Sequence, residues 1–365
     1  MKIGDICAYA PKSQIKAGEA IDGAEYMFFT SSPDENKRYS EYQIDGEGII
    51  MGTGGNATLH YYSGKFATST DCIVLLPRNT LRCKYLYYYL KANMNILEAG
   101  FKGAGLKHTN KKYIGNIEIN KIPDCTKQDE IILILDKLEK IIDSRNKELT
   151  LYDDLIKARF VEMFGDPIAN EKSWPTKSLE DACRIIVDCP HSTPGYTSEN
   201  TGFMCIRTSI VKKNRIMWDE IEYIPENEYN KRIQRKKPEK GDVIYTREGA
   251  ILGIAAVIDR DCNVALGQRS MLLSPDGLQC TPEFLCTAMN CDSFLLNALK
   301  GQSGSASPHI NVGNIKAFKM IMPPVEQQEH FSSFIQQIDK SKATVQKALD
   351  ETQLLFDSLM QQYFG

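Results

Sequence analysis

The 365-residue sequence lacks several features that would assign it to a common class of protein. It contains no run of 18 apolar residues, which excludes a transmembrane helix, and its first ten residues lack the apolar core of a secretory signal. Its eleven cysteines are an odd number, and none lies in a CxxC pair. The nearest pairs, Cys183/Cys189 and Cys286/Cys291, do not have metal-ligand spacing. We therefore expect free thiols, no metal and a reducing, cytoplasmic location, with a zinc site that uses a histidine as the alternative.

The sequence also lacks the motifs that catalysis on DNA requires. A DNA amino-methyltransferase needs Asn or Asp before, and an aromatic residue after, a pair of prolines, but Pro323 and Pro324 follow a methionine and precede a valine. No Gly-rich dinucleotide fingerprint, P-loop, GxSxG or HExxH motif is present. Pro123-Asp124 with residues 137–140 is a poor match to a PD…ExK nuclease set. We expect that the chain performs no chemistry itself and binds no cofactor.

Charge is distributed unevenly along a chain whose net charge is −3. Residues 1–123 carry a net charge of +3 and residues 166–324 a net charge of 0. The acidic excess lies in residues 124–165 and 325–365, each with a net charge of −3. DNA affinity depends on local neutralisation of phosphates. A basic face on residues 1–123 or on residues 166–324 could therefore bind DNA despite the negative net charge of the chain.

Residues 127–165 and 326–365 share one periodic pattern. In each stretch, apolar residues recur at alternating steps of four and three positions, which is an a/d heptad seam. Each seam position of the second stretch has a residue number 200 higher than its counterpart in the first. The seam positions are Ile131, Leu135, Leu138, Ile142, Arg145, Leu149, Tyr152, Ile156, Arg159 and Met163, and then Phe331, Ile335, Ile338, Lys342, Val345, Leu349, Thr352, Phe356, Leu359 and Tyr363. Both stretches begin with Gln and Glu two apart (Gln128/Glu130 and Gln327/Glu329) and end in Phe-Gly.

We expect two helices of about 37 residues, each about 55 Å long, that bury these seams on each other. The alternative is two unrelated amphipathic helices, each packed on its own domain. Arg145, Arg159, Lys342 and Thr352 interrupt the apolar pattern. Long cations at such positions can lie along the interface with their charged ends in water, or can fix the register of the pair.

The segments between the helices repeat as well. Each contains a short apolar strand before a polar bend, a strand that ends in a Gly turn, another apolar strand, a helix, a Gly-rich polar loop and a Gly-Asn-Ile sequence. The paired segments are 26–32 and 203–209, 49–55 and 243–249, 71–77 and 270–275, 84–98 and 282–299, 102–110 and 301–309, and 115–117 and 313–315. The pattern predicts an α+β domain used twice, with domains at 1–123 and 166–324 and helices at 124–165 and 325–365.

Basic and polar loops fall at corresponding places in both halves, and we predict that they bind DNA. Lys and Arg neutralise phosphates, whereas Arg, Gln and Asn can pair with base edges in the major groove. The candidates in the first half are Lys102, Lys107, His108, Asn110, Lys111 and Lys112. The candidates in the second half are Arg207, Lys212, Arg215, Arg247, Arg269, Gln302, Ser303, Ser305, His309 and Asn311. A solvated surface charge is the competing interpretation for each residue alone, and for the basic stretch 231–240.

The order of domain, helix, domain and helix resembles the DNA-specificity (S) subunit of type I restriction-modification systems. The resemblance covers the whole chain and is carried by the helix openings at 122–130 (IPDCTKQDE) and 322–329 (MPPVEQQE), by the Phe-Gly end at 159–167 (RFVEMFGDP), and by residues 301–315 (GQSGSASPHINVGNI). The second half matches more specifically, because the first helix opening lacks the double proline.

The resemblance implies two target recognition domains that each read one half of a split DNA sequence from the major groove. It implies that the helices pack antiparallel, set the gap between the half-sites and dock two modification subunits. Those subunits would bind S-adenosylmethionine and methylate adenine at N6, and restriction subunits would use ATP and Mg²⁺. The chain itself would be non-catalytic, cytoplasmic and without a membrane partner.

Three other interpretations remain open from the sequence. The chain could serve a bipartite system in which restriction and modification are one polypeptide. It could be a methyltransferase or nuclease of unfamiliar type, which would need a methyl-donor or metal site. It could also be a scaffold held by a helical hairpin that binds no nucleic acid, and the salt dependence of DNA binding separates that case from the others.

Overall fold

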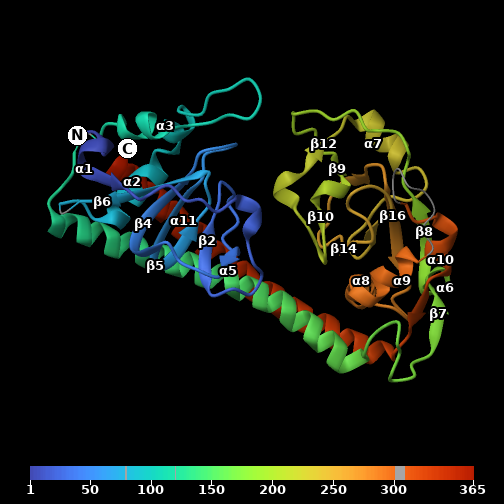
Figure 1. The fold of residues 1–365 in the computed structure, drawn as a ribbon. Helices are drawn as coiled ribbons and strands as arrows, with labels where there is room; N and C mark the ends of the chain where they lie inside the picture. Colours follow the sequence, from blue (N-terminus) through green and yellow to red (C-terminus); the bar gives the residue numbers. More distant parts are fainter. Residues whose placement is uncertain (79, 120, 301–308) are drawn as a thin grey trace. The chain divides into compact units, whose positions relative to one another are not determined.

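The computed structural model describes residues 1–78, 80–119, 121–300 and 309–365, and the chain divides into two compact units (Figure 1). Unit 1 comprises Met1–Lys147 and Gln346–Gly365, and unit 2 comprises Glu148–Val345. Each unit therefore contains one globular part and a section of each of the two long helices. The two units are described separately below.

Unit 1 is built on one mixed sheet of six strands in the order β1-β6-β4-β5-β2-β3. Its strands are β1 (Cys7–Tyr9), β2 (Tyr26–Phe29), β3 (Arg38–Tyr39), β4 (Ile44–Gly52), β5 (Leu59–Thr68) and β6 (Cys72–Pro77). Its short helices are α1 (Ile3–Ile6), α2 (Cys83–Ala92), α3 (Met94–Glu98) and α4 (Lys111–Gly115), with a 3₁₀ turn at Ala17–Glu19. The β2–β5 pair is parallel, whereas the other neighbours are antiparallel.

The sheet of unit 1 is buried on both faces where β4 crosses it. Ile49 and Met51 join the large cluster that contains α2, whereas Ile50 joins a smaller cluster with Phe29 and Phe66. This division follows from the two-residue period of a strand, which sends successive side chains to opposite faces. The run of apolar residues at the end of β4 is therefore typical of a strand in the middle of a sheet.

Unit 2 contains smaller sheets. Its strands are β7 (Thr176–Ser178), β8 (Cys183–Asp188), β9 (Met204–Ile206), β10 (Val211–Lys212), β11 (Arg215–Ile216), β12 (Glu222–Tyr223), β13 (Val243–Thr246), β14 (Ala255–Val257), β15 (Val264–Leu266), β16 (Ser270–Pro275) and β17 (Lys319–Ile321). Its short helices are α6 (Leu179–Ala182), α7 (Glu226–Arg232), α8 (Pro282–Met289), α9 (Asp292–Leu299) and α10 (Val312–Ala317), with 3₁₀ turns at Thr208–Ile210 and Trp218–Glu220. The sheets are β14-β13-β16-β8, β12-β9-β15, β17-β7 and β10-β11, and β9 and β15 are parallel.

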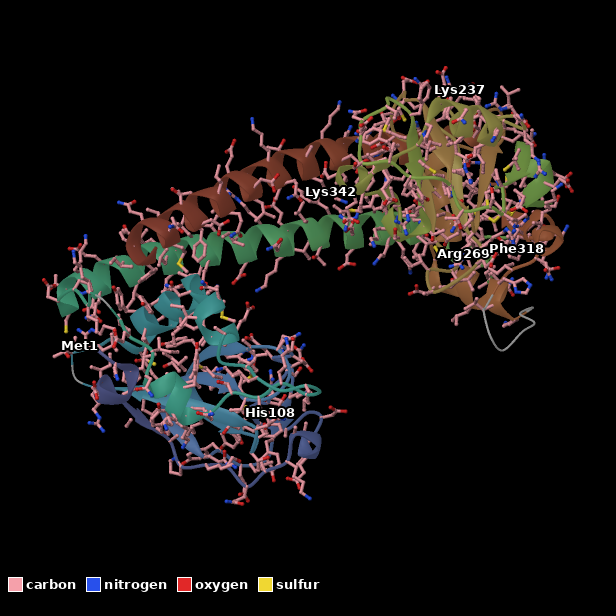
Figure 2. The ribbon with its side chains drawn as sticks, turned by 90° about the horizontal axis from the view of Figure 1, so that it is seen from above. Met1, His108, Lys237, Arg269, Phe318 and Lys342 are labelled. Atoms are coloured by element: carbon pink, nitrogen blue, oxygen red, sulfur yellow. The ribbon has the colours of Figure 1, made fainter. Side chains whose placement is uncertain are left out.

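The two long helices, α5 (Cys125–Phe164) and α11 (Val325–Phe364), have 40 residues each and run side by side (Figures 1 and 2). Every seam position predicted from the sequence is buried or half-buried, so the predicted phase is confirmed in both helices. In unit 1 the start of α5 packs with the end of α11, and in unit 2 the start of α11 packs with the end of α5. The helices are therefore antiparallel and share their seams, as expected.

The polar residues that interrupt the seams have partners along the helix pair. Arg145 of unit 1 donates through Nη1 to the carbonyl oxygen of Ala348 and to the hydroxyl of Thr352. In unit 2, the Lys342 ammonium lies 2.7 Å from an Asp153 carboxylate oxygen. Arg159 places its guanidinium carbon 5.9 Å from the ring centroid of Phe334. These contacts are specific to one alignment of the helices, so they favour one register over others.

A buried glutamine joins the start of each long helix to its globular part. The Gln128 amide donates to the carbonyl oxygens of Thr80 (2.9 Å) and Pro123 (2.8 Å), and its oxygen accepts from the Arg82 backbone N–H (2.8 Å). The sequence comparison paired Gln128 with Gln327, but its structural counterpart is Gln328.

The Gln328 amide makes the same three contacts in unit 2, with the carbonyl oxygens of Gln279 (2.9 Å) and Pro323 (2.8 Å) and with the Thr281 N–H (3.0 Å). Both glutamines are fully buried. Thr80 and Arg82 precede α2, and Gln279 and Thr281 precede α8. Each glutamine therefore fixes the start of its long helix against the chain that enters α2 or α8. We call this arrangement the glutamine clamp.

The segments 84–98 and 282–299, each predicted as one helix, are each two helices. In unit 2, Cys291 adopts extended backbone angles between α8 and α9, and in unit 1 Asn93 leaves the helical region between α2 and α3. Asn93 also donates its side-chain amide to the carbonyl oxygen of Phe364, at 3.2 Å, and so satisfies a group at the end of α11.

The phenylalanine of each Phe-Gly sequence packs on an aromatic ring of α2 in unit 1 or of α8 in unit 2. Phe364 meets Tyr85 edge-on at 5.2 Å in unit 1, and Phe164 meets Phe284 edge-on at 5.0 Å in unit 2. The shared Phe-Gly ends thus have the same packing role in both units.

Candidate nucleic-acid interface

Three of the candidates in unit 1 lie on one exposed loop between α3 and α4. Lys102 and His108 pair through two backbone hydrogen bonds of 3.0 Å, which close the loop. Lys107 lies inside the closed loop, next to His108. A backbone bond from Gly55 to the Lys107 carbonyl, at 3.0 Å, attaches the loop to the end of β4. The loop therefore presents two lysines and a histidine from a defined base, and His108 is visible at the surface of unit 1 in Figure 2.

The remaining candidates of unit 1 begin helix α4. Asn110 is its N-cap, because the side-chain oxygen accepts from the Tyr113 N–H at 3.0 Å. The Lys111 ammonium lies 5.2 Å from the ring centroid of Tyr9, and both Lys111 and Lys112 are exposed. The structure thus gives Asn110 a structural role and leaves the lysines as a basic surface next to the loop.

In unit 2, Arg207 and Lys212 lie on either side of the turn that follows β9. Arg207 donates through Nη1 to both carboxylate oxygens of Glu222, at 2.9 and 3.0 Å, and its guanidinium covers the ring of Tyr196 at 5.1 Å. The hydrogen bond that Arg207 donates to Glu222 raises the pKa of the guanidinium above its ordinary value, so this side chain is a cation. Lys212 reaches back to the Ser209 carbonyl at 2.8 Å. Both residues are held in defined positions.

Arg215 is exposed on β11, opposite Lys212 in the β10–β11 hairpin. Arg269 is exposed just before the start of β16 (Figure 2). Its nearest carboxylate oxygen, on Glu248, is 4.0 Å away. Asn311 is exposed at the start of α10, and the backbone of His309 pairs with that of Glu248 in an isolated antiparallel bridge. Gln302, Ser303 and Ser305 lie outside the described residues.

Two arginines of the basic stretches are buried and have structural partners. Arg247 makes a two-pronged ion pair with Asp188, at 2.9 and 3.1 Å. Arg232, within the stretch 231–240, has a side chain that is 1% exposed and pairs with Glu228 at 2.8 Å. It also donates to the carbonyl oxygens of Leu266 and Ser192. Both cations therefore hold loops in place, and DNA contact by Arg247 remains a prediction.

Sequence reasoning missed the groups that position Arg207. Glu222 and Tyr196 are 15 and 11 positions away in the sequence and belong to different segments. It also missed Gln268, which is half-buried and donates to the Thr193 hydroxyl at 3.3 Å. Gly267, which precedes Gln268, is the one sequence signal for this site, because glycine is common where two backbone segments approach closely.

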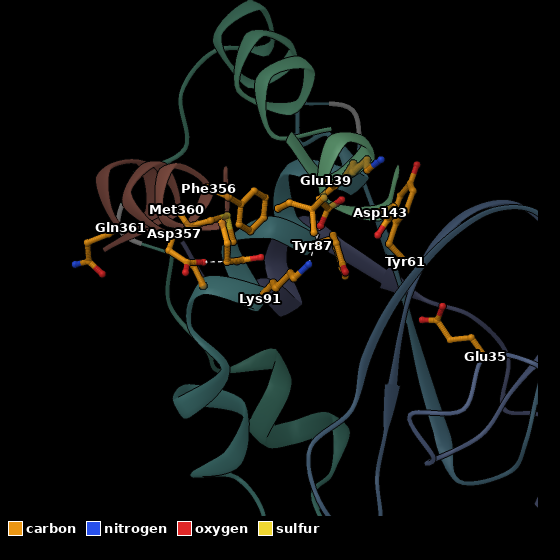
Figure 3. Close-up of a pocket in the computed structure, with 14 residues that line it drawn as sticks. Glu35, Tyr61, Tyr87, Lys91, Glu139, Asp143, Phe356, Asp357, Met360 and Gln361 are labelled. Carbon is orange, nitrogen blue, oxygen red and sulfur yellow. Dashed lines mark hydrogen bonds and ion pairs between the residues drawn. The ribbon is translucent and has the colours of Figure 1, made fainter. Parts of the chain in front are cut away.

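A cavity of about 610 Å³ in unit 1 lies between α2 and the long helices (Figure 3). Lys91 lies within it beside Tyr87 and pairs with Glu139 at 2.7 Å. The other charged lining residues are Glu35, Asp143 and Asp357, together with Lys84. Because carboxylates outnumber cations there, the cavity repels phosphates and suits a cationic partner.

The described residues contain neither a metal-binding cluster nor a membrane-spanning helix. They contain no group of three or more His, Cys, Asp or Glu side chains arranged to hold a metal ion. In the same part of the chain, no helix is both long enough and apolar enough to cross a membrane. Burial raises the pKa of several cysteine thiols, for example that of Cys7 to about 12, so these thiols are poor nucleophiles.

Comparison with known proteins gives a consistent result. A family model described as the type I restriction modification DNA specificity domain matches residues 1–151 and 171–352. The type I restriction enzyme MjaVIII specificity subunit of Methanocaldococcus jannaschii is 23% identical over 322 residues, which cover 82% of this chain and 75% of that protein. The EcoKI specificity subunit of Escherichia coli is 20% identical over 375 residues, which cover 97% and 76%. The crystal structure of a type I S subunit from M. genitalium superposes with a TM-score of 0.65 at 14% identity, over 100% of this chain and 95% of that one.

Proposed function

Because the chain belongs to the family of type I restriction-modification DNA specificity domains, we propose that its two units each read one half of a bipartite DNA sequence. Specificity subunits of type I systems recognise DNA, are not catalytic and assemble into restriction-modification complexes. The observation that carries the proposal is the repeated unit: the same glutamine clamp and the same helix end recur, but the loops at the surface differ. Two units that share a scaffold but differ in their surface residues are suited to bind two different half-sites.

DNA binding by each unit would combine phosphate contacts with a few base contacts. In unit 1 the exposed lysines of the 102–108 loop and of α4 supply charge, and in unit 2 Arg215 and Arg269 do so. Each good base contact supplies about 1–3 kcal/mol of discrimination. Two linked units add these energies, because the second contact becomes intramolecular once the first has formed. We propose that the long helices set the gap between the half-sites.

We propose that the partners on the helices are two modification subunits, with restriction subunits completing the complex. Large apolar side chains on the described part of α5 remain exposed at Leu133, Ile134 and Ile141 in unit 1, and at Leu151, Leu155 and Val161 in unit 2. Exposed apolar surface of this kind is typical of protein interfaces. S-adenosylmethionine, ATP and Mg²⁺ would then bind to the partner subunits, and the complex would act in the cytoplasm, where chromosomal DNA is accessible.

The alternatives are less well supported. The family's subunits do not catalyse reactions, so a methyltransferase or nuclease of unfamiliar type is not favoured. A system with a fused restriction-modification polypeptide would also use two half-sites, and the genes next to this one would distinguish it.

Single-molecule sequencing of methylated adenines in the host, with and without this gene, tests the proposed function. We expect one methylated motif that depends on the gene and consists of two short specific segments separated by a fixed number of unspecified bases. A gene-dependent motif without such a gap, or no gene-dependent motif in a host that carries intact modification subunits, would contradict the proposal.

A further inference from the structure

The parallel strands β9 and β15 bring two polar segments of unit 2 together. Their register pairs Met204 with Val264 and Ile206 with Leu266, and the Gly267 N–H continues the ladder to the Ile206 carbonyl at 2.9 Å. Residues 207–209 and 267–269 therefore leave the sheet side by side, at the carboxyl ends of adjacent parallel strands.

Gly267 permits the close approach of these segments. A Cβ at this position would lie 3.0 Å from the Ile206 carbonyl oxygen and 3.4 Å from the Tyr196 hydroxyl. Any larger residue would therefore push the two segments apart. Behind them, Arg232 binds the carbonyl of Leu266 at 3.1 Å, and the Arg247 N–H binds the carbonyl of Arg269 at 3.0 Å. The two strand ends thus form a supported structure.

These segments enclose a small polar pocket of about 100 Å³. Its lining consists of Arg207, Thr208, Ser209, Gln268 and Arg269. Arg269 has a φ of +72°, a left-handed conformation that is rare and unfavourable for an arginine. Such conformations persist where the surroundings impose them and are concentrated at functional sites. The pocket presents guanidinium, amide and hydroxyl groups and no carboxylate, so it suits a ligand rich in hydrogen-bond acceptors.

The two arginines of the pocket are held differently. Arg207 is oriented by Glu222 through Nη1 and by the Tyr196 ring, and no hydrogen bond within the described part of the chain engages its Nε–Nη2 edge. A guanidinium whose charge a carboxylate already balances is better suited to directional hydrogen bonds than to neutralising a phosphate. The guanidinium of Arg269 has one ionic contact among the described residues, the 4.0 Å contact with Glu248, so most of its charge is available.

Building on the proposed function, we infer that this pocket reads the major-groove edge of a purine in the half-site of unit 2. Arg207 donates from its Nε–Nη2 edge to O6 and N7 of a guanine, which is the pairing that the geometry of a guanidinium favours. Gln268 extends the polar surface toward the neighbouring base, and Arg269 binds the adjacent phosphate. Arg207 is thus the residue that determines specificity, whereas Arg269 supplies affinity without sequence preference.

Unit 1 has the same strand arrangement with different side chains. Its β2 and β5 are also parallel, with Phe29 beside Thr68, and they are followed by residues 30–32 (TSS) and 69–71 (STD). At the position of Arg207 stands Thr30, whose hydroxyl accepts from the Lys37 ammonium at 3.1 Å. Hydroxyl groups and the Asp71 carboxylate replace the guanidinium groups. Because Thr30 and Ser69 are buried, unit 1 does not present the counterpart of Arg207 to a ligand, so the inference applies to unit 2 alone.

The test compares Arg207→Ala and Arg207→Lys with Arg269→Ala in the assembled complex, by methylome sequencing and by competition binding with DNAs that carry each single base change. Both Arg207 variants should lower discrimination at one base of one half-site about 5- to 150-fold. Lysine keeps the charge but loses the paired donors, so it should not restore discrimination. Arg269→Ala should weaken binding to all sequences alike and reduce the slope of log K against log salt by about 1.

Arg260→Ala is the matched control, because Arg260 also pairs with a carboxylate, of Asp259 at 3.1 Å, and covers an aromatic ring, of Trp218 at 4.6 Å, but lies outside the pocket. It should leave both half-sites unchanged. Retention of the other half-site reports that an Arg207 variant is folded and assembled.

The inference is overturned if the Arg207 variants keep full base discrimination, or if they lose affinity uniformly with a smaller salt slope, as a phosphate contact would. A wild-type chain that directs no bipartite methylation would instead refute the proposed function.

Discussion

Deleting residues 144–150 and 344–350 together is expected to shorten the gap between the two half-sites by about three base pairs and to leave the bases of both half-sites unchanged. Seven residues of α-helix span about 10 Å, and DNA rises about 3.4 Å per base pair. The two deleted segments are equivalent, because one follows the other by 200 positions in the repeated seam. The original site would then no longer be methylated, which makes the expected effect all-or-none.

The deletion removes one heptad from each helix and therefore keeps the phase of both seams. It also keeps the helices matched, because residues near 145 in α5 contact residues near 350 in α11. Methylome sequencing gives the gap and the half-sites in one measurement. Deletion of 144–150 alone is the control and should abolish assembly, since the helices no longer match. Unchanged spacing in the double deletion, or altered bases, would show that the helices do not set the gap.

Gln328→Ala is expected to destabilise unit 2 by about 3 kcal/mol or more, because it leaves three backbone groups without their hydrogen-bond partner. These are the Thr281 N–H and the carbonyls of Gln279 and Pro323. A buried polar group that loses its partner costs about 1–3 kcal/mol. Urea denaturation followed by hydrogen exchange in each unit measures the loss and locates it.

Gln128→Ala should produce a loss of the same size in unit 1, since Gln128 makes the equivalent contacts. Gln337→Ala is the matched control on α11, because Gln337 is exposed, and its effect should stay within about 0.5 kcal/mol. If the Gln328 variant were as stable as this control, the glutamine clamp would not be a structural element of the unit.

The sequence predicted the long helices well because their signal is local and repeated. A heptad seam depends only on residues that are close along the helix. Its predicted phase is correct even at Arg145 and Lys342, which are charged but half-buried. The break between α8 and α9 was not predicted, although Asn290, Asp292 and Ser293 surround Cys291 and their side chains can compete with the helical backbone for hydrogen bonds. The pairing of Gln128 with Gln328 was missed by one position, since adjacent glutamines are equivalent in sequence but only one points into the core.

The candidate site was less predictable, because it depends on contacts between distant segments. Arg247 and Arg269 look alike in sequence, yet Arg247 meets Asp188, 59 positions away, and is buried, whereas Arg269 stays exposed. Composition can therefore locate a basic surface but cannot separate structural cations from free ones. The pocket around Arg207 requires the parallel pairing of β9 with β15, which no local pattern indicates.

The central claim is that two like units each read their own half of one DNA site, and exchanging residues 168–320 for the matching segment of another family member tests it most directly. Methylome sequencing of the hybrid should show one half-site replaced by that of the donor, with the other half-site and the gap unchanged. A hybrid that assembles and methylates DNA but alters both half-sites, or neither, would contradict the account.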